Sequence, residues 1–175
     1  DGKAIIDVRE DKSIGVYSDG TLKLGESTIT ANNQAVNYFS DNNGKIEIVA
    51  GKNSKATTGQ SSLLFYTKGN GKVILNGEIE AVIKGGATPG TRGTAFYYIS
   101  PTRYGVFDTD AVQDYFNNTF GNGTSTLNNL KLNMEQDSRL FVASNVGMNL
   151  SNTSADNLMT GITNAPTITG SDYKT

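Results

Sequence analysis

The sequence repeats itself, and this repetition limits the folds open to the chain more than any other feature. Four segments share one pattern: a short apolar or aromatic run, a polar turn containing Gly or Asn, and an alternating strand. They span residues 13–24, 34–48, 61–75 and 137–150. Copies that recur every ~20–50 residues are typical of solenoids and propellers, in which each copy is one structural unit.

Equivalent positions can be matched across the copies. Tyr17, Phe39 and Tyr66 occupy the aromatic position, and Val142 is the fourth member. We expect the copies to stack in parallel register about 4.8 Å apart, with these aromatic residues in one buried column. A second buried column is expected to contain Leu24, Ile48 and Leu75. Partial copies are expected at residues 5–8 and 96–100.

The copies are unequally spaced. Tyr17 and Phe39 are 22 residues apart, whereas Phe39 and Tyr66 are 27 apart. A propeller needs blades of nearly constant length, whereas a solenoid accommodates extra residues as loops between stacked strands. We therefore predict an all-β solenoid with loops at residues 51–59 and 85–93. A β-sandwich, which also contains short alternating strands, is the alternative.

Composition supports many short strands and excludes several classes of site. The chain contains 20 Gly, 20 Thr and 19 Asn, and these residues favour tight turns and strands. The net charge of −2 does not indicate the basic surface that nucleic-acid binding requires. Cys and His are absent, which excludes zinc sites built on thiolate or imidazole and nucleophilic triads that need His. No apolar run reaches the ~20 residues of a membrane-spanning helix.

One segment has helical rather than strand periodicity. Residues 109–120 carry a single apolar stripe, and Asp108 or Thr109 can cap the helix N-terminus. The stripe is expected to cover an open flank of the solenoid. Asp108, Asp110 and Asp114 also resemble a carboxylate cluster, although capping is the preferred interpretation. The stripe consists of Ala111, Val112, Tyr115, Phe116 and Phe120.

These patterns predict a solenoid fragment over residues 1–150. An insertion at about residues 85–131, which includes helix 109–120, interrupts it. Residues 151–175 are interpreted as a polar C-terminal extension that starts further coils. The chain begins at Asp1 without a charged and apolar leader, so we interpret it as a piece of a larger precursor.

The segment IGVYSDGTLKL, with its looser copies ending in GKIEI and GKVIL, resembles passenger domains of type V autotransporter adhesins from Gram-negative anaerobic bacteria. The resemblance covers about residues 13–150. It implies a right-handed parallel β-helix at the bacterial cell surface, outer-membrane-anchored or secreted, that takes part in attachment to host cells or other bacteria. The chain departs from that pattern at the helix and between residues 85 and 132.

Other parallel β-helices are polysaccharide lyases, which hold Ca²⁺ with clustered carboxylates. The acids of this chain are scattered, and Glu26, Glu47 and Glu78, which recur near the repeats, are interpreted as a solvated outer face. We therefore predict no catalysis, no metal and no cofactor. A structural spacer that presents a distal binding domain is the alternative to an adhesin, and a lyase is the second alternative.

The insertion is the expected binding region, because insertions on one face of a solenoid often carry its contacts. It concentrates tyrosine and arginine, which are enriched at binding hot spots. Arg92, Arg103 and Tyr104 are the candidate contact residues for a protein or glycan on a host or bacterial surface. The last two follow Pro101, which favours an exposed turn.

Overall fold

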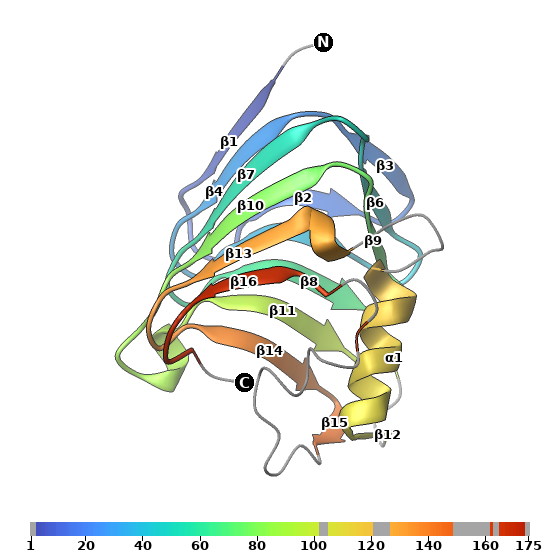
Figure 1. Ribbon diagram of the computed structural model, residues 1–175, viewed down its shortest axis with the longest axis vertical. Coiled ribbons are helices and arrows are strands. Elements are labelled where there is room, and N and C mark those ends of the chain that lie inside the picture. Colours follow the sequence, from blue (N-terminus) through green and yellow to red (C-terminus); the bar gives the residue numbers. More distant parts are fainter. Residues whose placement is uncertain (1–2, 102–104, 121–126, 149–161, 163–164, 174–175) are drawn as a thin grey trace.

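The computed structural model describes residues 3–101, 105–120, 127–148, 162 and 165–173, and it has a solenoid-like all-β fold (Figure 1). The chain runs through successive coils, and each coil adds one strand to each of the flanking sheets. The first sheet contains β1 (Ala4–Val8), β4 (Ser27–Ala31), β7 (Asn53–Thr58), β10 (Glu78–Ile83), β13 (Leu130–Met134) and β16 (Thr167–Gly170). The second contains β2 (Ile14–Ser18), β5 (Val36–Ser40), β8 (Leu63–Lys68), β11 (Thr94–Ile99) and β14 (Arg139–Ser144).

The remaining elements complete the coils. The third sheet contains β3 (Thr21–Leu24), β6 (Lys45–Ile48) and β9 (Lys72–Leu75), and a two-stranded sheet contains β12 (Gly105–Phe107) and β15 (Val146–Met148). The helices are α1 (Thr109–Phe120) and the short 3-10 helices η1 (Pro89–Thr91) and η2 (Leu127–Asn129). Every strand pairing between described residues is parallel, for example β3 with β6 and β6 with β9. The β-sandwich alternative is therefore wrong, since its sheets are antiparallel.

The predicted register between copies is confirmed. Tyr17 pairs with Phe39, and Phe39 pairs with Tyr66, in adjacent strands of the second sheet. The partial copy at 96–100 continues the same column, because Tyr66 pairs with Tyr97. In the third sheet, Leu24 aligns with Ile48 and Ile48 with Leu75, as expected.

The aromatic column, however, lies on the outer face of the second sheet rather than in the core. Tyr17 is 48% exposed, and Phe39, Tyr66 and Tyr97 are half-buried. Their rings contact one another along the stack, at 4.2 Å between the Phe39 and Tyr66 centroids. Neighbouring residues in a strand face opposite sides of the sheet, so the buried column is the preceding one. It consists of Val16, Tyr38, Phe65, Phe96 and Phe141.

The first sheet was largely missed by sequence analysis. Residues 51–59 are not a loop, because 53–58 form β7, and residues 5–8 belong to the first sheet rather than to the aromatic column. In β7 the buried side chains are the small residues Ser54, Ala56 and Thr58. A strand that buries only small side chains resembles a loop in composition, which is why β7 escaped prediction. The loop expected at 85–93 is confirmed, and it contains η1.

Helix α1 has the bounds expected from its apolar stripe, and it covers the flank that the third sheet leaves open after β9 (Figure 1). It contacts β9 and β12. Phe116 packs against Phe96 at 4.8 Å, and Phe120 packs against Phe65 at 5.4 Å between ring centroids. The helix therefore closes the aromatic core of the later coils.

Capping by Asp108 is also confirmed. The backbone N–H of Ala111 donates a hydrogen bond of 2.9 Å to Asp108 Oδ1, which is the geometry of an N-cap.

We expect Asp108→Ala to lower the free energy of unfolding by about 1 kcal/mol in urea denaturation, because a helix N–H loses its acceptor. Asp114→Ala, in the exposed middle of the helix, is the control and is expected to change stability by less than about 0.5 kcal/mol. Equal losses in the two variants would contradict the capping role.

Candidate functional site

A crevice of about 550 Å³ lies between α1 and the turn that joins β8 to β9. One wall is the turn at residues 69–72, and the other is one face of the helix. Tyr98, from β11, contributes to the floor. The crevice therefore unites a turn and a helix that are more than 35 residues apart in sequence, at the place where the helix replaces the third sheet.

Helical periodicity places the wall residues of α1 side by side. Ala111, Asp114 and Asn118 are spaced three and four residues apart, so they lie on one face. Asp114 and Asn118 are exposed, which leaves a carboxylate and an amide available to a ligand. The adjacent face of the helix carries the apolar stripe that packs into the core. Burial of that stripe fixes the direction in which the polar face points.

The floor of the crevice is aromatic and rigidly held. The rings of Tyr98 and Tyr115 are 4.5 Å apart between centroids, and both residues are buried. The Tyr115 hydroxyl lies 2.7 Å from the Thr67 hydroxyl, which anchors the helix to β8. Burial raises the pKa of the Tyr115 phenol above its usual value of 10.0, so this group stays protonated at neutral pH. The hydroxyl thus serves as a hydrogen-bonding group rather than as a base.

The opposite wall is a tight turn built by glycine. Gly69 has a φ of +57°, and a Cβ atom there would lie 2.0 Å from Asn42 Oδ1 of the preceding coil. The positive φ favours glycine here, and a larger residue would also have to move the Asn42 side chain. Lys72, at the start of β9, is exposed beside it and supplies one positive charge to balance the carboxylate of Asp114.

The predicted contact residues do not line this crevice in the part of the chain that the structure describes. Arg92 lies at the opposite end of β11, before the strand begins, and its side chain is only 17% exposed. The six residues of β11 span about 20 Å. Arg103 and Tyr104 lie outside the described residues, so their role in binding stays a prediction.

The loop at 85–93 is tied to its neighbours rather than projecting freely. Ser61 Oγ donates to the carbonyl of Gly90 at 2.7 Å, and the N–H of Ser61 donates to the carbonyl of Thr91. Lys84 and Glu135 form an ion pair of 2.6 Å beside the loop. The hydrogen bond from Lys84 lowers the pKa of Glu135, which keeps this carboxylate charged. The loop is therefore part of the corner between the first and second sheets.

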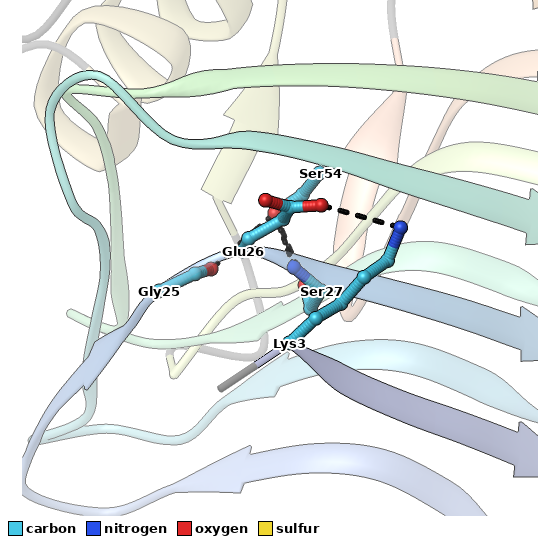
Figure 2. Close-up of polar contacts among 5 residues, drawn as sticks. All are labelled: Lys3, Gly25, Glu26, Ser27 and Ser54. Atoms are coloured by element: carbon cyan, nitrogen blue, oxygen red, sulfur yellow. Dashed lines mark hydrogen bonds and ion pairs between the residues drawn. The ribbon is translucent and has the colours of Figure 1, made fainter. Parts of the chain in front are cut away.

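The recurring acids form separate ion pairs with lysine. Glu47 lies in the third sheet, whereas Glu26 and Glu78 border the first sheet in coils separated by β7. Figure 2 shows Lys3 reaching Glu26, next to the buried serines Ser27 and Ser54, whose hydroxyls are 3.1 Å apart. The three acids therefore do not share one outer face, and the Glu47 side chain is only 17% exposed. The ion pairs are Lys3–Glu26 at 3.2 Å, Lys45–Glu47 at 3.7 Å and Lys131–Glu78 at 2.9 Å.

The residues that the structure describes contain neither a metal-ligating cluster nor a helix able to cross a membrane. Within them, no three His, Cys, Asp or Glu side chains gather as a group able to hold a metal ion. No helix among them combines the length and apolar character needed to cross a bilayer.

Sequence reasoning found the helix and the tyrosine-rich strand but missed the site that they build. In the sequence, Asp114 stands out only as a member of an acidic cluster, and residues 69–72 resemble the Gly- or Asn-containing turns of the other copies. The spacing of Ala111, Asp114 and Asn118 was the available signal, since these small and polar residues line one helix face beside the apolar stripe. The turn that faces these helix residues is determined by stacking between coils, so no local sequence pattern could predict it.

Comparisons with known proteins found no relative of this chain. No family model, no curated protein and no solved structure matches the chain.

Proposed function

We propose that the chain is a right-handed parallel β-helix that serves as a non-catalytic, surface-exposed adhesin segment in attachment to host cells or other bacteria. The handedness rests on a general rule: connections between parallel strands of one sheet are right-handed in about 98% of cases. The adhesin role rests on the resemblance of the repeats at 13–75 to autotransporter passenger domains. We place this protein at the bacterial cell surface for the same reason.

The observation that carries the proposal is the crevice beside α1. A spacer needs only coils that hold one another together. The apolar stripe of α1 serves that purpose, whereas the exposed polar residues Asp114 and Asn118 do not contribute to it. Here the insertion builds an open crevice of about 550 Å³ with an aromatic floor and polar walls, which combines apolar surface with polar groups able to contact a ligand. Asp114 and Asn118 supply acceptors and donors, and Lys72 supplies one charge.

Cell binding by the 175-residue chain tests this proposal. Fluorescently labelled protein is expected to bind epithelial cells or partner bacteria saturably, and Asp114→Ala/Asn118→Ala is expected to weaken binding about tenfold or more. Asp11→Ala/Asn33→Ala is the matched control, because it removes one exposed carboxylate and one exposed amide far from the crevice. Circular dichroism and urea denaturation verify that each variant is folded.

The possible outcomes separate the alternatives. No saturable binding by the wild-type chain would favour the spacer. Undiminished binding by the crevice variant would move the contact surface elsewhere. An Arg92→Ala/Arg103→Ala/Tyr104→Ala variant then tests the surface predicted from sequence. Cleavage of an acidic polysaccharide that a single carboxylate substitution abolishes would favour the lyase.

A further inference from the structure

Two arginines meet at the outer corner between the first and second sheets, away from the crevice. Arg92 ends the loop before β11, and Arg139 is the first residue of β14. The backbone N–H of Arg139 donates a hydrogen bond of 2.8 Å to the carbonyl of Gly93, next to Arg92. Arg139 also pairs in register with Thr94. Parallel stacking therefore brings these arginines together from positions 47 residues apart in sequence.

Arg92 is incompletely satisfied where it lies. Its Nε atom is buried and has no hydrogen-bond partner. Its Nη2 atom lies 3.6 Å from Asp137 Oδ1, which is an ion-pair distance but longer than a hydrogen bond. A buried donor without an acceptor costs free energy, and this cost is larger for a charged group. Neither the buried Nε atom nor the long contact with Asp137 therefore fully satisfies the guanidinium of Arg92.

The local charge balance is also uneven. Partial burial lowers the pKa of the Arg139 guanidinium, and the positive charge of Arg92 lowers it further. Asp137 lies within ion-pair distance of Arg92. The nearby Glu135 is already engaged by Lys84 at 2.6 Å. A like-charge pair beside low-dielectric protein attracts an anion.

We propose that Arg92 and Arg139 form a binding site for a single oxyanion, such as a carboxylate or a sulfate group. Guanidinium groups offer planar forks of N–H donors that match both kinds of oxyanion. The anion lies between the two side chains, accepts hydrogen bonds from both, and competes with Asp137 for Arg92. This site is independent of the proposed adhesin role, because it rests on the geometry of this corner alone.

NMR titration of the arginine Nε–Hε resonances tests the site in the 175-residue chain. Sodium sulfate and sodium acetate are added separately, with sodium chloride at matched ionic strength as the reference. We expect the Arg92 Nε–Hε resonance to shift saturably, with a dissociation constant in the millimolar range. The comparison of sulfate with acetate identifies which oxyanion the site prefers.

Three variants are expected to change the anion affinity in different ways: one weakens binding, one strengthens it and one leaves it unchanged. Arg139→Gln keeps most of the side chain but removes the charge, and it is expected to weaken binding about tenfold. Asp137→Asn removes the competing carboxylate and is expected to strengthen binding severalfold. Arg9→Gln is the control, since Arg9 is an exposed arginine already paired with Asp7 at 2.6 Å, and it is expected to leave the anion affinity unchanged.

The proposal is overturned if the wild-type resonance shows no saturable shift beyond that caused by chloride. It is also overturned if Asp137→Asn binds sulfate and acetate no more tightly than wild type. Backbone amide spectra report whether Arg139→Gln remains folded, and Asp137→Asn keeps the test decisive if it does not. Cell binding is not a readout here, so failure of the anion site and failure of the adhesin proposal are distinguishable.

Discussion

Replacement of Phe96 by alanine is expected to lower the free energy of unfolding by about 4 kcal/mol, as is typical of a large aromatic side chain removed from a core. Phe96 is fully buried in β11. Its ring contacts Phe65 of the preceding coil at 5.8 Å, and it contacts Phe116 and Phe120 of α1 at 4.8 Å and 5.2 Å. Truncation therefore leaves a cavity at the junction of the second sheet and the helix. Urea denaturation followed by circular dichroism measures the loss.

Tyr17→Ala is the matched comparison, because Tyr17 belongs to the outer aromatic column and is 48% exposed. The Tyr17 ring makes one edge contact with the Phe39 ring at 5.2 Å between centroids, and an aromatic pair contributes about 1 kcal/mol. The expected loss is therefore about 1 kcal/mol. If both variants lost the same stability, the assignment of inner and outer columns would be wrong. Solenoids can unfold in segments, so amide hydrogen exchange around α1 accompanies the denaturation curves.

Asn37→Leu is expected to destabilise the protein by about 3 kcal/mol although leucine is apolar and similar in size. Asn37 is fully buried, and its amide donates hydrogen bonds of 3.1 Å to the carbonyls of Ile29 and Thr57. The Thr58 hydroxyl donates to Asn37 Oδ1 at 2.8 Å. Each buried group that loses its partner costs about 1–3 kcal/mol. Asn37 thus joins strands of the first and second sheets inside the coil.

Two variants test whether the hydrogen bonds rather than the side-chain shape account for the effect. Thr58→Val removes only one of the three bonds, so a loss of about 1 kcal/mol is expected. Asn53→Leu replaces an exposed asparagine of β7, and it is expected to change stability by less than about 0.5 kcal/mol. Urea denaturation measures all three variants. A loss for Asn37→Leu no larger than that for Asn53→Leu would show that the buried amide contributes no net stability.

The sequence alone determined which segments of the second and third sheets stack and in what register, but not most of the first sheet. The aromatic run, the Gly- or Asn-containing turn and the alternating strand recur in each copy, and a strand period of two fixes the alignment once the turns are matched. The helix at 109–120 was equally predictable, because its cap, its apolar stripe and its length are all local features.

Only the tertiary structure decided which face of each strand is buried and which residues meet across coils. Phe65 and Tyr66 are neighbours of similar size, and only the packing of the sheets places Phe65 inside. Small residues such as Ser54 form a buried strand although their composition is that of a loop. The crevice beside α1 and the pair of Arg92 and Arg139 arise in the same way, since stacking joins residues that the chain keeps more than 25 positions apart. Local patterns encode elements and their register, whereas burial and proximity depend on how whole coils pack.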